Sequence, residues 1–230
     1  MTGTYDTILQ LPLFQGLSRV DLTNTIERFS FHFQKYKDGE RIVTGGSPST
    51  HVIFIMNGEI RSELHNDKKT LRITEIGEAP CMITPLNMYG HIQTHLCDVF
   101  AVGNVGIMKI EKQSFFSMIQ TNEIFYYNIL NYLSGRNQIS TKSLLNIFGT
   151  NARKRFALWL LPLTNSYATK IILNCRRTNL ASILGLSRPT LQTMLEGMVE
   201  EDIISIEDRK IHINDRTKLY DILNSIELDN

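Results

Sequence analysis

The sequence predicts an α+β protein with three parts: an N-terminal antiparallel β-roll, a long helix, and a C-terminal helical module that carries a two-stranded β-wing. Two observations predict this class. Short β-prone runs alternate with turn residues in the N-terminal half, whereas apolar residues repeat at helical spacing beyond it. We therefore expect a β-roll domain over residues 1–122, a dimerisation helix and hinge over 123–150, and a helical domain with a wing over 151–230.

Composition sets the broad class of the protein. The chain has 230 residues, of which 42% are apolar and 20% are charged, as in a globular protein of two ordinary domains. The N-terminus lacks the basic and apolar regions of a signal peptide, and no long apolar run follows, so we expect a cytoplasmic protein without a membrane span. Cys81, Cys97 and Cys175 are widely spaced, which predicts free thiols rather than a disulfide framework or a metal knuckle.

The N-terminal part begins with a short amphipathic helix over 18–29 and then changes to strand patterning. Short runs rich in Val, Ile and Phe follow from residue 31 to residue 110. Turn signals separate them, including Lys37-Asp-Gly39 and Asn57-Gly58, the latter between expected strands 51–56 and 59–64. Regular spacing of this kind predicts an antiparallel sandwich or roll.

A long helix is predicted over 123–148. Seven of its residues step alternately by four and three, the a/d spacing of a two-stranded coiled coil: Tyr126, Leu130, Leu133, Asn137, Ser140, Leu144 and Ile147. This seam predicts a homodimer, although the same stripe could instead pack the helix on its own β domain. Gly149-Thr-Asn151 is expected to end the helix as a hinge, with Asn151 capping the next helix to Leu163.

The stretch from Thr178 to Leu195 has the pattern of two short helices joined by a tight turn. Ala181 is small where the helices must cross, and Gly185 relieves the backbone between them. Ser187 is expected to cap the second helix, with Pro189 in its first turn, where a missing amide hydrogen costs no helical bond. An ordinary helical hairpin would show the same spacings.

Charge and the residues that follow favour a DNA-binding module over an ordinary hairpin. Residues 151–195 contain seven cationic side chains and no acidic one, whereas 196–230 contain four cations and ten acids. After the helix pair, the β-patterned runs 203–206 and 210–213 flank a polar turn, as in a two-stranded wing. These features together predict a winged helix-turn-helix.

The second helix of this module is the expected contact with double-stranded DNA. Its outward polar residues are Arg188, Thr190, Gln192 and Thr193, after the cap residue Ser187. Arg suits guanine and Gln suits adenine, and Arg188 and Gln192 lie one turn apart, so both can point into a major groove. Ser187 and Thr190 are better placed for phosphates.

The order of these parts resembles the Crp/Fnr family of bacterial transcription regulators. The matching segments are 11–17, 37–43, 57–60 and 185–191, of which Gly185-Leu-Ser-Arg-Pro-Thr-Leu191 is the most specific. The resemblance implies a homodimer that reads a palindromic site and contacts the DNA through Ser187 and Arg188. RNA polymerase is a further partner that the resemblance implies. Family members commonly have a Glu and a second Arg where this chain has Pro189 and Thr193, which implies a different base preference.

The expected effector segment departs from the cyclic-nucleotide-binding relatives. Those relatives neutralise the cyclic phosphate with an Arg, whereas residues 77–95 contain neither Arg nor Lys. Burying a phosphate without a counter-charge is unfavourable, so we expect no cAMP binding. The oxygen-sensing branch ligates an iron–sulfur cluster through several Cys, mostly near the N-terminus, and the first Cys here is Cys81, which also argues against that cofactor.

The identity of the effector is left open by the sequence. We expect its pocket near Gly77, Met82, Met88, His91 and His95. Met and His can ligate haem iron. The segment Gly58-Glu-Ile-Arg-Ser-Glu-Leu64, followed by the Pro-rich loop, is similar to the HcpR branch, which is linked with nitrosative stress and haem. Packed or exposed side chains without a ligand role, and loss of effector binding, are the alternatives.

Two other classes of function are an enzyme and a protein-binding scaffold. No nucleophile elbow, P-loop, zinc-protease or dinucleotide-binding motif is present, so we expect no enzyme. A β-roll scaffold that binds proteins without DNA is the remaining alternative, and it leaves the acid-free stretch 151–195 unexplained.

Overall fold

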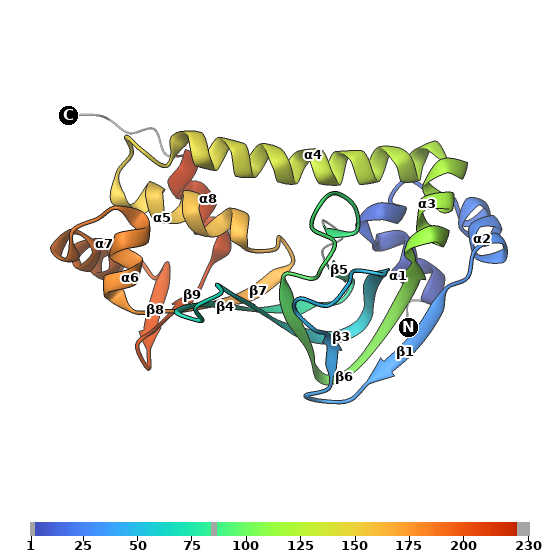
Figure 1. Ribbon diagram of the computed structural model, residues 1–230, viewed down its shortest axis with the longest axis horizontal. Helices are drawn as coiled ribbons and strands as arrows, with labels where there is room; N and C mark the ends of the chain where they lie inside the picture. Colours follow the sequence, from blue (N-terminus) through green and yellow to red (C-terminus); the bar gives the residue numbers. More distant parts are fainter. Residues whose placement is uncertain (1–2, 84–86, 225–230) are drawn as a thin grey trace. The chain divides into compact units, whose positions relative to one another are not determined.

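The structure is a computed structural model that describes residues 3–83 and 87–224. It confirms the predicted α+β class, with an antiparallel β-roll, a long helix and a C-terminal winged helical module (Figure 1). The chain divides into two compact units, which we call the roll unit (Met1–Ser62 with Ile76–Gly135) and the C-terminal unit (Glu63–Glu75 with Arg136–Asn230).

Short helices open the roll unit. They are α1 (Thr4–Gln10), the 3-10 turn η1 (Pro12–Phe14) and α2 (Arg19–Arg28). α2 is the amphipathic helix expected from the sequence, and a capping box begins it: Ser18 Oγ accepts from the Asp21 amide at 3.1 Å, while the Asp21 carboxylate accepts from the Ser18 amide at 3.1 Å.

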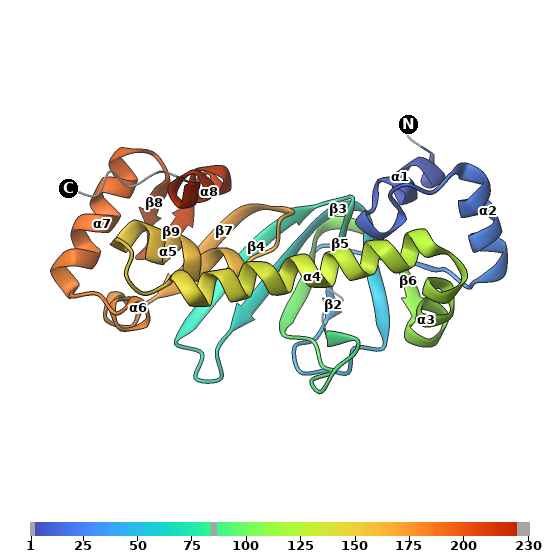
Figure 2. The same ribbon diagram turned by 90° about the horizontal axis from the view of Figure 1, so that it is seen from above.

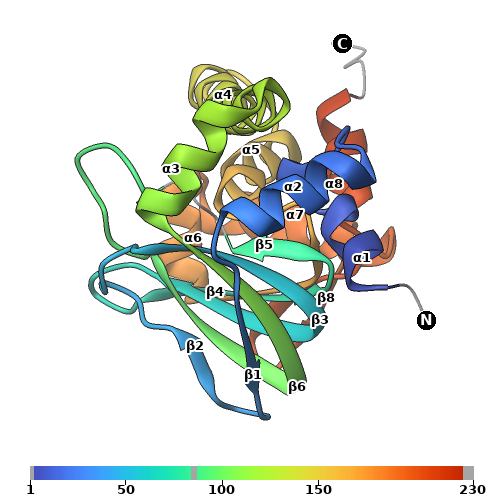
Figure 3. The ribbon, with the colours of Figure 1, turned by 90° about the vertical axis from the view of Figure 1, so that its right-hand side faces the viewer.

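The roll itself is antiparallel. Its strands are β1 (His32–Tyr36), β2 (Arg41–Val43), β3 (His51–His65), β4 (Leu71–Glu78), β5 (Cys81–Ile83) and β6 (Cys97–Glu111). β1 pairs with β6 from His32↔Lys109 to Tyr36↔Val105, and β3 pairs with β5 (Figure 3). Phe14, Phe54 and Phe125 stack edge to face in the core that joins the roll to the helices.

One predicted turn is wrong. Asn57 and Gly58 do not separate two strands, because β3 runs without a break from His51 to His65. Gly58 has a φ of +86°, and a Cβ there would lie 2.5 Å from the carbonyl oxygen of Asn104 on β6. The Asn57 side chain accepts from the Gly106 amide at 3.0 Å. Asn-Gly therefore marks a close approach of two long strands, not a hairpin.

After α3 (Lys112–Thr121), the predicted long helix is α4 (Glu123–Asn146), two residues shorter than expected. Its residues up to Gly135 belong to the roll unit. There Phe125 and Ile129 are buried in the roll core, and Tyr132 and Leu133 pack partly against it.

The C-terminal unit continues from Arg136. Its elements are α5 (Ala152–Leu160), η3 (Leu161–Leu163), β7 (Ala168–Cys175), α6 (Arg177–Leu184), α7 (Arg188–Glu200), β8 (Ile204–Glu207), β9 (Lys210–Ile213) and α8 (Arg216–Asn224). β8 and β9 form the predicted wing, and their turn places Asp208 and Arg209 at φ of 48° and 65°, as a tight two-residue hairpin requires. β7, which the sequence analysis did not anticipate, pairs with the other edge of β9.

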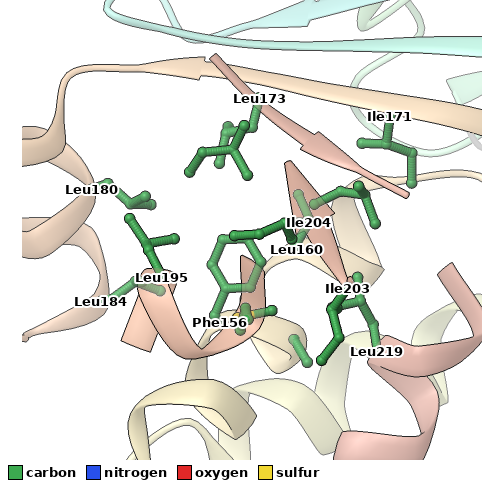
Figure 4. Packing of buried hydrophobic residues seen from close by; sticks show 14 of the residues in the cluster. Phe156, Leu160, Ile171, Leu173, Leu180, Leu184, Leu195, Ile203, Ile204 and Leu219 are labelled. Carbon is green, nitrogen blue, oxygen red and sulfur yellow. The ribbon is translucent and has the colours of Figure 1, made fainter. Parts of the chain in front are cut away.

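One apolar core holds these elements together. Figure 4 shows residues from α5, α6, α7, β7, β8 and α8 converging on one another. Phe156 and Leu160 of α5 are fully buried there, as is Leu173 of β7. At about 25 cal/mol per Å² of apolar surface, burial on this scale provides the main stabilisation of a small domain.

The hairpin residues Glu63–Glu75 also belong to this unit. Ile73 is part of its core. Glu75 is buried, and its two carboxylate oxygens accept from the backbone amide and side-chain amide of Asn165 at 2.6 and 2.8 Å. Burial raises the pKa of Glu75, and the bonds from Asn165 oppose that rise.

Candidate nucleic-acid interface

The turn between α6 and α7 is built as the sequence predicted. Gly185 ends α6 with a φ of 61°, the left-handed conformation that glycine adopts without strain, and its amide donates to the Ala181 carbonyl. Leu180 and Ala181 on one helix and Leu191 on the other are buried between them. The tight turn and the close packing fix the orientation of α7 relative to α6.

Arg155 of α5 holds this turn in place, a role that sequence reasoning missed. Its guanidinium donates to the carbonyl oxygens of Leu184 at 2.9 Å, of Gly185 at 3.1 Å and of Thr150 at 3.3 Å. The bonds to Leu184 and Gly185 satisfy carbonyls that have no helical partner at the end of α6. Arg155 therefore belongs to the scaffold rather than to the basic surface.

The first turn of α7 is capped as expected. Ser187 Oγ accepts from the Thr190 amide at 3.1 Å, and the two hydroxyl oxygens lie 2.7 Å apart. Pro189 lies in the first turn, where it breaks no bond. Ser187 and Thr190 thus present adjacent hydroxyls beside the free amides of the helix N-terminus, an arrangement suited to a phosphate.

The five residues predicted to contact DNA all have exposed side chains: Ser187, Arg188, Thr190, Gln192 and Thr193. The opposite face of α7 is buried, with Leu191, Met194, Leu195 and Met198 in the core. The amphipathic pattern of the helix therefore presents its polar face outward as one surface, which we call the α7 face.

An acidic residue also lies on α7. Gln192 Nε2 donates to Glu196 Oε1 at 2.6 Å. The spacing of four residues is the one at which helical side chains meet, so it could have been read from the sequence. This contact orients the Gln192 amide, and it places a carboxylate next to the proposed base-reading side chain.

The basic surface is smaller than the charge count of 151–195 suggests. Arg155 binds backbone carbonyls, and Arg153 pairs with Glu201 at 2.6 Å. Arg177 is half-buried, and burial lowers its pKa. Arg176 and Arg188, at the N-termini of α6 and α7, are exposed and remain suited to contact phosphates.

The residues expected at the effector pocket do not share one environment. Met82 and Met88 are 3% and 1% exposed and belong to the roll core, and Gly77 is buried in β4. His91 is exposed, whereas His95 is half-buried, and burial lowers its pKa. Residues 84–86 of this segment lie outside the described residues, and the rest shows no group of three or more His, Cys, Asp or Glu that could hold a metal ion.

Three arginines of the β-strands outside this segment are already engaged. The Arg61 guanidinium lies 4.9 Å from the centre of the Phe100 ring, and that of Arg41 lies 5.1 Å from the same ring. Arg72 lies 3.9 Å from Glu63. The cysteines are free thiols, as expected, and burial raises the pKa of Cys81 to about 12, which keeps it protonated.

Comparison with known families identifies both domains. Residues 154–222 match the Crp-like helix-turn-helix domain, and residues 33–122 match the cyclic nucleotide-binding domain. These two domain matches support the Crp/Fnr family for this chain. The helix-turn-helix match runs from α5 to α8 and includes the whole α7 face, so the chain has the fold of a DNA-binding transcription regulator of that type.

The chain is also similar to solved structures. The Thermus thermophilus Catabolite Activator Protein is 18% identical, with a TM-score of 0.54 over 92% of this chain and 97% of that one. FixK2 from Bradyrhizobium japonicum is 16% identical, with a TM-score of 0.46 over 84% and 96%. DNR from Pseudomonas aeruginosa is 19% identical, with a TM-score of 0.45 over 93% and 95%. No curated protein sequence matches the chain. Within the described residues, no helix is both long and apolar enough to cross a membrane.

Proposed function

We propose that this Crp/Fnr protein is a homodimeric transcription regulator that binds a palindromic DNA site through the α7 face. The observation that carries the proposal is the exposed polar face of the capped helix α7. The buried apolar face of the helix and the tight turn at Gly185 keep this polar face on the outside. Arg188 and Gln192 read base edges in the major groove, Ser187 and Thr190 bind phosphate, and Thr193 lies beside the readout pair. RNA polymerase is the expected further partner.

Selection of bound sequences from a random DNA library, with the full chain, tests this proposal. The expected product is an inverted repeat whose half-sites are centred about 34–36 Å apart, or one turn of DNA. Enrichment of a single unrepeated half-site would contradict the dimeric readout. Uniform binding of all sequences would contradict specific recognition, and no binding would favour the scaffold alternative.

The dimer is proposed on the basis of an exposed apolar stripe on α4. Tyr126, Leu130 and Leu144 of the predicted seam are 56%, 43% and 73% exposed. The residues that pack the helix on its own core, Phe125 and Ile129, lie about a quarter turn around the helix from that seam. The alternative is that α4 only packs on its own roll. Phe125 and Ile129 make that contact, but it leaves the seam residues Tyr126, Leu130 and Leu144 exposed. A second copy of α4 has the matching a/d pattern.

The effector is proposed to be something other than cAMP. The described residues of 77–95 include no Arg or Lys, and burial of a cyclic phosphate among Met82, Met88 and His95 would lack a counter-charge. Two cations from outside the segment are already engaged: Lys112 of α3 donates from Nζ to Gln93 Oε1 at 2.6 Å, and Arg61 stacks on Phe100.

A haem-dependent nitrosative-stress sensor, as in the HcpR branch, is the second proposal for the same domain. His95 favours it, because partial burial lowers its pKa and keeps the imidazole in the neutral form that ligates iron. Purified protein reconstituted with haem should then show a Soret band that shifts in His95→Ala and not in His91→Ala. A spectrum that both variants leave unchanged, or no band at all, rejects it.

A further inference from the structure

The start of α5 contacts α7 near the C-terminal end of that helix. Arg153, the second residue of α5, donates from Nη1 to Glu201 Oε1 at 2.6 Å, and Glu201 is the residue at which α7 ends. The other terminal nitrogen of the guanidinium, Nη2, occupies the space that a Cβ on Gly197 would fill. A single side chain of α5 therefore holds α7 at two positions that lie one helical turn apart.

The contact with Arg153 explains why a glycine lies in the interior of α7. Glycine is a poor helix former, and Gly197 is not among the glycines with a positive φ, so no turn requires it. An alanine at this position would meet the end of the flexible Arg153 side chain rather than backbone atoms. Such an alanine would therefore displace the guanidinium and leave the helix itself intact.

The start of α5 also holds the chain on the other side of the α7 face. Arg155 donates to the carbonyl oxygens of Leu184 and Gly185, in the turn that leads into α7. α5 packs against both α6 and α7 (Figure 2). The two arginines thus bond to the chain before and after the α7 face, and both come from the same short segment of α5.

Polar contacts of this kind fix the rotation of a helix more closely than apolar packing does. Hydrophobic contact has no preferred direction, whereas hydrogen bonds from a guanidinium depend on both distance and angle. Recognition of a base by Arg or Gln uses paired hydrogen bonds, which tolerate misorientation of only about 10–20°. The Arg153–Glu201 pair adds little stability, because its side chains are 35% and 52% exposed.

We propose that Arg153 is a positioning residue for DNA readout. Together with Arg155 it fixes the rotation of α7 about its own axis, and Gly197 keeps free the space that this contact needs. The inference rests on the proposed binding of DNA by the α7 face, and it deepens that proposal. Arg153 is not part of the α7 face, and it acts on the base preference through Glu201 and Gly197.

Arg153→Gln and Gly197→Ala test the proposal in the full chain. The site that wild type selects from a random library is compared with the same site carrying one changed base pair in each half-site, at one salt concentration. The ratio of the two affinities measures discrimination, and a charge lost from the protein affects both sites alike. Each variant should lower this ratio about fivefold or more, the lower end of what one bidentate base contact contributes.

Thermal melting separates positioning from stabilisation. Gly197→Ala replaces a helical glycine with a better helix former, so it should melt at no lower temperature than wild type while it loses discrimination. The double variant shows whether the two residues form one contact. If Gly197→Ala acts only by displacing Arg153, adding it to Arg153→Gln should lower the ratio no further. Arg19→Gln is the matched control, because it removes an exposed ion pair with Asp6 in the roll unit and should leave the ratio unchanged.

Several results would overturn the proposal. These are wild-type discrimination in both single variants, effects of the two substitutions that add in the double variant, and a loss of discrimination that occurs only where the melting temperature also falls. A selected site that wild type and all variants share with equal discrimination rejects this inference and leaves the proposed function intact. A wild-type chain that selects no site rejects the proposed function and this inference with it.

Discussion

Arg188 is the residue on which the proposed base readout most depends. It is exposed at the first position of α7, whereas its neighbour Ser187 is bound to Thr190 in the cap. Arg188→Ala should cost about 1–3 kcal/mol of binding to the selected site and relax preference at one base pair per half-site. Library selection with wild type and variant at one salt concentration measures both effects.

Thr190→Ala is the matched control for that experiment. Loss of a phosphate contact weakens binding to all DNA sequences alike. Thr190→Ala should therefore lower the affinity without changing the selected site. If Arg188→Ala also retains the wild-type preference at every position and changes only the salt dependence, Arg188 is a solvated charge and not a base reader.

Glu196 is expected to sharpen the preference of Gln192 for adenine. Because Gln192 Nε2 donates one hydrogen to Glu196, the amide is held in one orientation, with its oxygen and its second N–H directed away from the bond. Adenine offers one donor and one acceptor to such an amide. Glu196→Ala should therefore reduce discrimination at that base pair by about 1 kcal/mol in the same selection assay.

Glu200→Ala provides the control, since Glu200 is an exposed acid one turn further along α7. Removing either acid should raise affinity for all DNA through the phosphates. Only Glu196→Ala should alter the preference at one position, and identical selected sites for the two variants would show that the contact has no part in readout.

At the scale of elements, α4 carries two apolar stripes, one packed on the roll core and one exposed. Phe125 and Ile129 contact the roll core, and the seam through Leu130 stays exposed in the single chain. Leu133 lies between them and is packed partly on the core, so its substitution would disturb the roll as well as the dimer.

Leu130→Asp together with Leu144→Asp should yield monomers. Both side chains are exposed in the single chain, and like charges at a paired seam oppose association. Light scattering on the full chain measures the mass. Tyr127→Asp, at a position 66% exposed on the other side of the seam, should keep the dimer. A dimer that survives the double substitution means that α4 is not the interface.

At the scale of the whole molecule, the N-terminal domain matches the cyclic nucleotide-binding domain, but the expected effector segment lacks a cation to pair with a phosphate. Residues 33–122 match that domain, yet the described part of 77–95 holds no cation. We expect no saturable heat from micromolar cAMP and no effect of cAMP on DNA affinity, because a buried phosphate would lack a counter-charge.

Calorimetry with wild type and Arg61→Ala checks this expectation. Saturable heat in wild type that disappears in Arg61→Ala would show that Arg61 leaves Phe100 and supplies the counter-charge. Saturable heat in both would place the phosphate against another cation.

The local features of this chain were predictable from the sequence. Asn151 and Ser187 cap their helices as expected, since a cap depends on a side chain and a backbone amide only three residues apart. The wing was predicted almost to the residue, because alternating apolar residues around a short polar turn specify a hairpin. The α7 face followed from helical periodicity alone.

Features made by distant segments were decided only by the tertiary structure. Arg155 looked like part of a basic surface, and only the fold brings it to the end of α6, 29 residues away. Asn57-Gly58 had the signal of a turn, and only the approach of β6 shows why a continuous strand needs that glycine. Residues 63–75 belong to the C-terminal unit, where Glu75 meets Asn165, 90 residues later, and only the fold brings these two residues together. Periodicity and capping report the neighbours of a residue along the chain, whereas packing partners across the fold depend on which surfaces must be buried together.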